Sequence, residues 1–153
     1  MPKKSAGILL YRIKNQLLEL FLVHPGGPLH VKRDEGAWSV PKGEFTDDED
    51  PLTAAKREFA EETGAAVEGN FIELSPVKQK SGKIVYAWAV EGDLDERQLV
   101  SNLFTMQWPP RSGRYQSFPE IDRGEWFSVQ TARQKIIPAQ AAFIDELVQL
   151  LNQ

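Results

Sequence analysis

The chain has 153 residues, a length typical of one globular domain with a buried core. Its net charge of −4 argues against a general nucleic-acid-binding surface, because such a surface needs many Lys and Arg side chains to neutralise phosphates. No apolar run approaches the roughly 18 residues of a membrane-spanning helix, and the absence of cysteine excludes disulfides and thiolate metal sites.

The first residues do not have the pattern of an export signal. Two lysines precede an apolar stretch at residues 8–11, but Arg12 ends this stretch, which is too short for the core of a signal peptide. We therefore expect a single domain over residues 1–153 that resides in the cytoplasm and has no membrane partner. The sequence does not determine the oligomeric state.

The first third of the chain predicts short β-strands. Two apolar segments separated by four mostly polar residues predict neighbouring strands at residues 6–12 and 17–24. A Pro-Gly-Gly-Pro break and a loop to Gly36 follow. Residues 38–40 then predict a short strand that Pro41 stops.

The clearest element is a helix between Asp50 and Gly64. Asp50 is a favourable N-cap, and Pro51 suits the first helical position. Apolar residues then recur at helical spacing until Gly64, which supplies a stop signal. We therefore expect one well-defined helix in the middle of the chain.

The second half predicts further strands and then helices. The predicted strands are residues 71–77, 84–90, 99–108 and 126–127. Ser128 can cap a short helix that continues to Lys135, and Pro138 begins a final amphipathic helix. Because the strands do not alternate regularly with helices, we expect an α+β fold with a mixed β-sheet and helices packed on it.

Acidic residues are concentrated around the central helix. Residues 44–73 contain ten acidic side chains and only two basic ones. Glu58, Glu61 and Glu62 stand at positions i, i+3 and i+4, so their side chains share one face of the helix and repel each other. Magnesium prefers such carboxylate ligands and would offset the repulsion. From these three residues alone, however, a solvated glutamate-rich face is the favoured interpretation.

A wider pattern reverses this preference. Seven residues stand at fixed spacings that resemble the Nudix box of the Nudix hydrolase family, G-x5-E-x7-R-E-F-x-E-E-x-G. They are Gly43, Glu49, Arg57, Glu58, Glu61, Glu62 and Gly64. At average residue frequencies, such a match at a given start arises by chance about once in a hundred million or less. Phe59 and Ala65 depart from the aliphatic residues usual in the box, but both lie at packing positions and leave the metal chemistry unchanged.

The resemblance extends beyond the box. Residues 41–44 resemble the residues that lead into the box of diadenosine polyphosphate hydrolases. Glu120, followed by residues 126–128, resembles the later glutamate and strand of many members. The whole chain is similar to a bacterial branch of predicted nucleoside triphosphate pyrophosphohydrolases. This resemblance implies a Nudix-like α/β/α sandwich.

The resemblance also implies an activity and a set of metal ligands. The expected enzyme uses magnesium, or manganese, to cleave a pyrophosphate bond in a nucleoside diphosphate linked to another group. Dinucleoside polyphosphates and nucleoside triphosphates are the favoured substrates, with no long nucleic acid as a partner. The residues matched to metal ligands, including the Gly43 carbonyl, are Gly43, Glu58, Glu61, Glu62 and Glu120.

The resemblance leaves more than one residue for the role of catalytic base. Glu58 or Glu61 is expected to take the proton of the attacking water, and Glu120 is an alternative base. Arg57 is expected to pair with a carboxylate, for which we choose Glu49, and to hold the loop of the box against the helix.

Substrate contacts are expected from residues outside this set. Lys42 can meet a phosphate as a point charge. Arg111 or Arg114 can bind an anionic group, and Trp108 or Tyr115 can stack on a base, although a rigid proline-containing loop explains these residues equally well.

For two other groups the sequence favours ordinary structural roles. The lysines at positions 78, 80 and 83 are expected on a solvated sheet edge, and the histidines at positions 24 and 30 are expected to be loop residues.

Two other functions remain as alternatives. One is a nucleotide-sensing domain that binds without turnover, which the intact box glutamates disfavour. The other is an RNA-end pyrophosphohydrolase, which the negative charge and the lack of a basic stripe disfavour.

Overall fold

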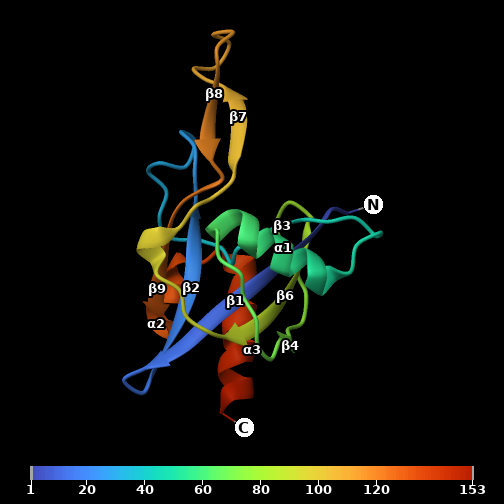
Figure 1. Cartoon of the computed structure of the whole chain (residues 1–153), viewed down its shortest axis with the longest axis vertical. Helices are drawn as coiled ribbons and strands as arrows, with labels where there is room; N and C mark the ends of the chain where they lie inside the picture. The colour runs from blue at the N-terminus through green and yellow to red at the C-terminus, as the bar shows by residue number, and fades with distance from the viewer. Residues whose placement is uncertain (1, 153) are drawn as a thin grey trace.

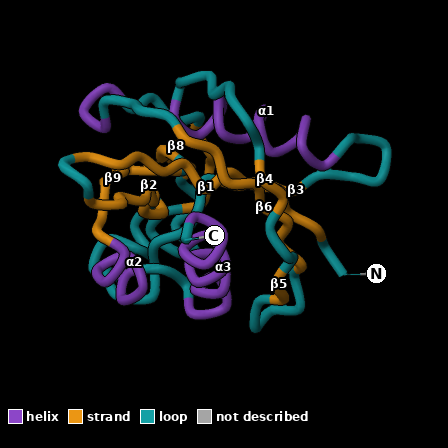
Figure 2. The backbone as a smooth tube through the Cα atoms, turned by 90° about the horizontal axis from the view of Figure 1, so that it is seen from below, coloured by secondary structure: helices purple, strands orange, loops and turns teal. Residues whose placement is uncertain are grey.

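The computed structural model describes residues 2–152, which form a mixed β-sheet between two layers of helices. The strands of this sheet are β1 (Lys4–Lys14), β2 (Leu17–Pro25), β3 (Lys42–Glu44), β4 (Ile72–Glu73), β5 (Val77–Lys78), β6 (Ile84–Glu91) and β9 (Ile121–Ser128). The helix α1 (Pro51–Thr63) covers one face, while α2 (Val129–Lys135) and α3 (Ala141–Leu151) lie on the other (Figures 1 and 2). The predicted α+β sandwich is confirmed.

The central strand β1 changes its partner halfway along one edge. Its other edge pairs in parallel with β6 from Lys4 to Tyr11. On the first edge, Ser5 to Gly7 pair with β3, whereas Tyr11 to Lys14 pair with β2. The sheet is therefore split between β3 and β2, and residues from all three strands line the cleft described below.

Alternating side chains of the sheet build two hydrophobic cores. Ile8 and Leu10 point into the core beneath α1, together with Phe59. Leu9 points into the core beneath α2 and α3, together with Phe143. This period-two pattern is what a strand buried on both faces requires. Phe59, unusual in its aromatic character for the box, is 1% exposed and serves as a core residue.

The central helix begins and ends as predicted. The Asp50 carboxylate accepts a hydrogen bond of 3.0 Å from the Thr53 N–H, and Pro51 occupies the first turn. Gly64 has φ 77°, a left-handed conformation that glycine adopts without strain, and its N–H donates to the Ala60 carbonyl. These local signals fix the helix that carries the box glutamates.

Two predicted strands are wrong in detail. Residues 38–40 form only isolated bridges, from Ser39 to Val23 and from Trp38 to Ile136. The Val40 N–H donates to the side chain of Gln140 instead of a strand, at 3.1 Å. Residues 71–77 are also not one strand, since they divide into β4 and the start of β5 around Pro76, which has no N–H for a ladder.

The largest difference from prediction concerns residues 99–108. The strand β7 (Leu103–Gln107) starts later than predicted and leaves the main sheet to pair with β8 (Tyr115–Pro119), a strand that the sequence pattern did not indicate. We call this two-stranded hairpin, residues 103–119, the arm. It projects away from the rest of the molecule (Figure 1).

Smaller differences occur at the end of the chain. The short strand predicted at residues 126–127 is the end of β9, which begins at Ile121 and pairs with β2. The last helix is preceded by a 3-10 turn, η2 (Pro138–Gln140), and another 3-10 turn, η1 (Glu96–Gln98), precedes the arm. Within residues 2–152, no helix is long and apolar enough to cross a membrane.

Candidate active site

A cleft of about 630 Å³ lies at the split in the sheet. Its lining includes four glutamates, Glu58, Glu61, Glu62 and Glu120. The first three come from one face of α1, and Glu120 lies between β8 and β9. The predicted metal-ligand side chains are thus brought together, although Glu120 is 58 or more residues away in sequence.

Gly43 places the backbone of β3 directly against one of these glutamates. A Cβ atom added at Gly43 would lie only 1.9 Å from Oε2 of Glu58. A larger residue at position 43 would therefore displace the Glu58 carboxylate from this position. The close approach puts the Glu58 carboxylate beside the backbone of residue 43, where the sequence predicts a carbonyl ligand.

Arg57 connects the loop of the box to the helix. Its Nε donates to Oε2 of Glu49 at 2.9 Å, and its NH2 group donates to Oε1 of the same carboxylate at 2.8 Å. Its NH1 group donates to Glu58 at 2.9 Å and to Glu61 at 3.2 Å. The geometry agrees with the Arg57–Glu49 pair expected from the sequence, and the same guanidinium also reaches two glutamates of the cleft.

Burial and like charges alter the acidity of the cleft residues. Burial raises the pKa of Glu62 to about 8, although the nearby Lys42 opposes this shift. Burial also raises the pKa of Glu58, against the opposing effect of Arg57. The pKa of Lys42 is lowered by burial and by the neighbouring Lys83. The buried end of the cleft therefore favours neutral groups until opposite charge enters it.

The donor set fits a magnesium-type ion, but it is not assembled around one point. Glutamate oxygens are the ligands that this hard cation prefers. Among residues 2–152, however, no three acidic or histidine side chains converge as a metal-binding group. Arg57 engages Glu58 and Glu61, while Glu62 accepts from the Lys42 N–H at 3.2 Å. A cation must therefore compete with these contacts for the glutamate oxygens.

Lys83 is a cleft residue that sequence reasoning assigned to a solvated edge. Its side chain is 24% exposed, lines the cleft and lies 3.3 Å from the Glu44 carboxylate. Lys78 and Lys80 are exposed, as expected. The sequence places Lys83 one residue before a predicted strand. It does not show that the side chain at this position faces the cleft.

His24 is likewise not a loop residue. It belongs to β2, is 1% exposed, and its Nδ1 lies 2.8 Å from the Asp122 carboxylate. Its Nε2 lies 2.7 Å from the Arg33 carbonyl. Both neighbours are hydrogen-bond acceptors. His24 thereby ties the loop of residues 25–36, which forms one wall of the cleft, to the start of β9.

Three of the expected substrate-binding residues lie elsewhere. Trp108, Arg111 and Arg114 are at the far end of the arm and do not line the cleft of their own chain. Lys42 does line it, next to Gly43. The cleft thus combines four of the seven box residues, Gly43, Glu58, Glu61 and Glu62, with Lys42 and Lys83, whereas the outer end of the arm lies outside it.

Replacing Gly43 tests the close approach between β3 and Glu58. Gly43→Ala should weaken divalent-metal binding, because its Cβ and the Glu58 carboxylate require the same space. The metal-free protein should lose about 1 kcal/mol of unfolding free energy or less, because a flexible side chain can move aside. Titration with Mn²⁺ and thermal unfolding measure the two effects.

Gly92→Ala is the matched control, since Gly92 lies away from the cleft and its added Cβ would meet only the end of the Leu10 side chain at 3.1 Å. Wild-type metal affinity in Gly43→Ala would contradict the proposed role of this glycine.

Known structures share this fold. An Ap4A hydrolase from C. elegans, in a binary complex, has a TM-score of 0.69 and 20% identity, covering 97% of this chain and 98% of that chain. The NUDIX domain of Shewanella oneidensis NrtR, complexed with ADP ribose, has a TM-score of 0.64 and 13% identity. The match covers 100% of this chain and 90% of that chain. A mutT/nudix family protein from Listeria innocua has a TM-score of 0.64 and 15% identity. The match covers 99% of this chain and 96% of that chain.

The sequence itself matches the family model described as NUDIX domain over residues 1–147. A comparison with curated proteins finds no match. The structural likenesses, all at low identity, establish the fold alone. The match over residues 1–147 shows that the chain belongs to the NUDIX domain family, and at the level of this family it confirms the predicted enzyme class, a Nudix pyrophosphohydrolase.

Proposed function

We propose that the chain, as a single domain, is a magnesium-dependent hydrolase of the pyrophosphate bond in a nucleoside diphosphate linked to another group. Manganese is the alternative ion. The observation that carries this proposal is the presence of five glutamates, Glu44 and the four expected as metal ligands, and two lysines in one cleft. Glutamates provide ligands for a cation, and lysines attract phosphate. One cleft can therefore hold both a cation and a polyphosphate chain.

The phosphate chain is best placed along the lysine end of the cleft. Lys42 and Lys83 both line this end, and burial together with the nearby Lys83 lowers the pKa of Lys42, so a bound anion would favour its charged form. Ser5 lines the cleft too, and its buried hydroxyl has no hydrogen-bond partner among residues 2–152. A buried hydroxyl without a partner is costly, and a phosphate oxygen would accept a hydrogen bond from it. These three groups support binding of a polyphosphate.

Glu58, Glu61 and Glu62 would hold the magnesium ions, with Glu120 and the Gly43 carbonyl as further ligands. When bound, magnesium neutralises phosphate charge and acidifies the attacking water. The proton of that water would pass to a carboxylate of the cleft. Glu58 suits this role because it lines the cleft and burial raises its pKa, and Glu61 is the alternative.

Arg57 positions these carboxylates without contacting the substrate. Its bidentate pair with Glu49 fixes the guanidinium, which in turn limits the rotation of Glu58 and Glu61. Such fixed donors reduce the cost of ordering the site when the substrate binds. Arg57 is therefore a positioning residue.

Dinucleoside polyphosphates and nucleoside triphosphates remain the favoured substrates. The C. elegans neighbour is an Ap4A hydrolase, and the Shewanella oneidensis neighbour binds ADP ribose, so this fold accommodates ligands with one or two nucleosides. The cleft of this chain adds two lysines suited to several phosphates. A sensing domain that binds without turnover is the alternative outcome of the experiments below.

Metal binding should depend on pH through Glu62. The pKa of Glu62, about 8, lies above the ordinary value of 4.5. The neutral carboxyl of Glu62 therefore contributes fully to the stability of the metal-free protein below pH 4.5, and this contribution is lost as the pH rises to about 8. A metal ion binds only the ionised carboxylate, so the rise in Tm on adding MgCl2 should be larger near pH 8.5 than near pH 6.

Thermal unfolding with MgCl2 and with chelator at both pH values measures this difference. In Glu62→Gln most of the pH dependence should disappear. A rise in Tm that is equal at both pH values in the wild type would contradict the assignment.

The activity is tested with a panel of nucleoside triphosphates, dinucleoside polyphosphates, ADP-ribose, NADH and capped RNA in the presence of MgCl2. We expect hydrolysis of at least one of the first two classes. Glu58→Gln should lower kcat by roughly 10²–10³-fold, the loss typical of removing one group that stabilises transition-state charge.

Glu68→Gln is the control, because Glu68 is 81% exposed and lies outside the cleft. Tight, magnesium-dependent nucleotide binding without hydrolysis of any substrate would reject the enzyme and favour the sensing domain. Equal losses in both variants would show that the effect is not specific to the cleft.

A further inference from the structure

The arm is joined directly to the wall of the cleft. Asn102 and Glu120, the residues just before β7 and just after β8, both line the cleft. The Glu120 N–H donates to the Asn102 carbonyl at 2.9 Å, and the Asn102 N–H donates to the Glu61 carbonyl at 2.9 Å. The root of the arm is therefore held by backbone hydrogen bonds to the helix that carries the box glutamates.

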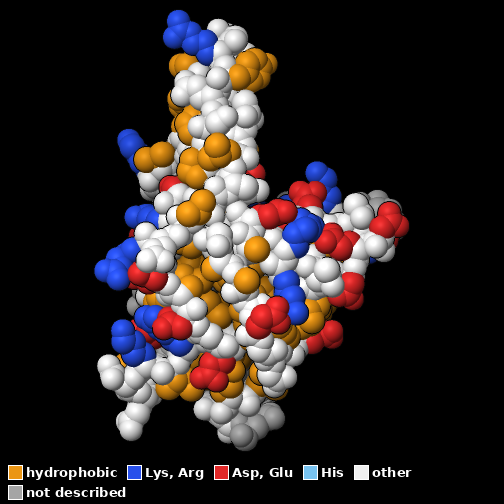
Figure 3. All heavy atoms as spheres, viewed as in Figure 1, with side chains coloured by type: hydrophobic (Ala, Val, Ile, Leu, Met, Phe, Trp, Pro, Cys, Tyr) orange, Lys and Arg blue, Asp and Glu red, His pale blue; other side chains and the backbone are white. Residues whose placement is uncertain are grey.

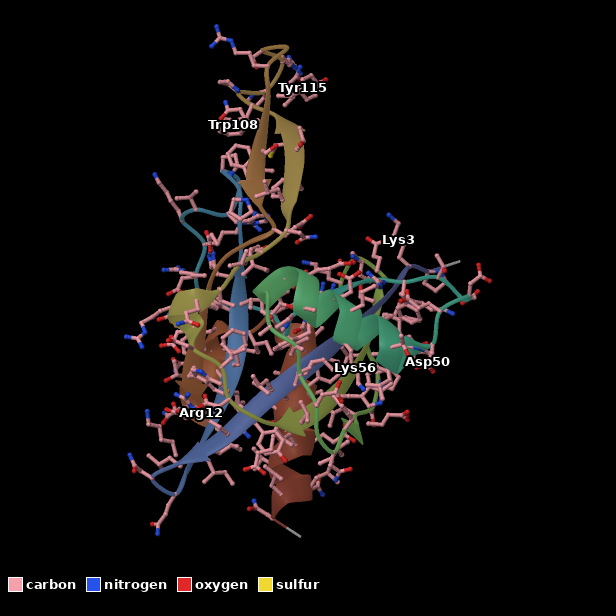
Figure 4. All side chains as sticks on the ribbon, in the orientation of Figure 1. Lys3, Arg12, Asp50, Lys56, Trp108 and Tyr115 are labelled. Atoms are coloured by element: carbon pink, nitrogen blue, oxygen red, sulfur yellow. The ribbon has the colours of Figure 1, made fainter. Side chains whose placement is uncertain are left out.

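The two faces of the arm differ in composition. Phe104 and Phe118 are paired across the strands, with ring centroids 6.0 Å apart. Trp108 alternates onto this same side, which we call the aromatic face. The opposite face carries Leu103, Tyr115 and a hydrogen bond between the hydroxyls of Thr105 and Ser117. Figure 4 shows Trp108 and Tyr115 on opposite sides of the arm.

The aromatic face is turned toward a second wall of the cleft. A Cβ atom added at Gly27 would lie 2.8 Å from the ring of Phe104, so this ring rests on the loop of residues 25–36. The same loop contributes His30 and Arg33 to the cleft. The cleft and the aromatic face are thus continuous along this loop.

Positive charge is concentrated at the tip of the arm. Arg111 and Arg114 are exposed, and among residues 2–152 their guanidinium groups form no ion pair or hydrogen bond. The Trp108 N–H donates to the Arg114 carbonyl at 2.9 Å, so these two residues are cross-strand neighbours. Figure 3 shows hydrophobic atoms along the arm and basic atoms at its tip. An aromatic side chain beside an unpaired arginine is suited to a base that carries a phosphate.

We propose that the aromatic face of the arm binds the second nucleoside of a dinucleoside polyphosphate whose phosphate bridge lies in the cleft. This inference rests on the proposed function and assigns one class of substrate to it. A five-residue strand extends about 17 Å at 3.4 Å per residue. Only a substrate that continues well beyond its reacting pyrophosphate reaches Trp108, and a nucleoside triphosphate held by its phosphates in the cleft does not.

The arrangement of apolar groups favours this occupant over a second copy of the chain. The most exposed large apolar residues of the arm are Leu103, at 64%, and Tyr115, at 69%, and both lie on the face opposite Trp108. A protein partner that buries apolar surface would use that face. The face continuous with the cleft instead carries partly covered rings and Arg114.

Equilibrium binding tests the proposal independently of turnover. The ligands are methylene-bridged, non-hydrolysable analogues of diadenosine tetraphosphate and of ATP, titrated in the presence of MgCl2. Trp108→Ala should raise the Kd for the diadenosine analogue about five- to a hundredfold, the range for loss of one base–aromatic stack, and should leave the Kd for the ATP analogue unchanged. Arg114→Ala should act in the same direction.

Tyr115→Ala is the matched control, an aromatic truncation at the same end of the arm on the opposite face, and it should change neither Kd. Equal loss for both ligands, or the same loss in Tyr115→Ala, would overturn the proposal. A larger effect of Trp108→Ala on a 5′-triphosphorylated oligoribonucleotide than on the diadenosine analogue would also overturn it, in favour of RNA.

Sedimentation of the wild type and the three variants completes the test. A wild-type dimer that Trp108→Ala or Tyr115→Ala dissociates would overturn the proposal in favour of a contact between copies. If the predicted binding pattern is found but no substrate is hydrolysed, the proposed activity fails while the arm assignment stands. If hydrolysis occurs but the arm variants bind both analogues like the wild type, only the arm assignment fails.

Discussion

The geometry of the cleft depends on one guanidinium group. Arg57 binds Glu49 through two hydrogen bonds and reaches Glu58 and Glu61 through a third nitrogen. Without this cation, the carboxylates on one face of α1 would repel each other and rotate freely. The planar guanidinium donates hydrogen bonds to the loop of the box and to the helix at the same time. A lysine ammonium cannot form this two-sided arrangement. Strand β3, which carries Gly43, is placed opposite these carboxylates by its pairing with β1.

The parts that could be predicted from the sequence depend on neighbours along the chain. Asp50, Pro51 and Gly64 determine the ends of α1 through a cap, a fixed φ and a left-handed turn, all within one helix length. Continuous apolar segments predicted β1 and β2, since both faces of the sheet are covered. The spacing of the box predicted which glutamates share the cleft, because 3.6 residues per turn place them on one face of α1.

The parts that could not be predicted depend on contacts distant in sequence. His24 appeared to be a loop residue because its acidic partner, Asp122, is 98 residues away. Lys83 faces the cleft because β6 pairs with β1, a register that no local pattern reveals. The strand of residues 99–108 was placed in the main sheet because β7 has ordinary strand alternation. The N–H of Asn102 instead bonds to the end of α1, which directs β7 out of the sheet.

Mn²⁺ affinity of Arg57→Lys, compared with the wild type by titration of free Mn²⁺ under identical conditions, tests the central claim most directly. The substitution keeps the positive charge and removes only the planar guanidinium that forms two parallel hydrogen bonds. The electrostatic effect of residue 57 on the ion therefore stays nearly constant. If Arg57 orients the metal-binding glutamates, affinity should fall roughly 10–100-fold, as for other groups that position metal ligands. Affinity equal to that of the wild type would contradict the account, because the glutamates would then form the site without the guanidinium.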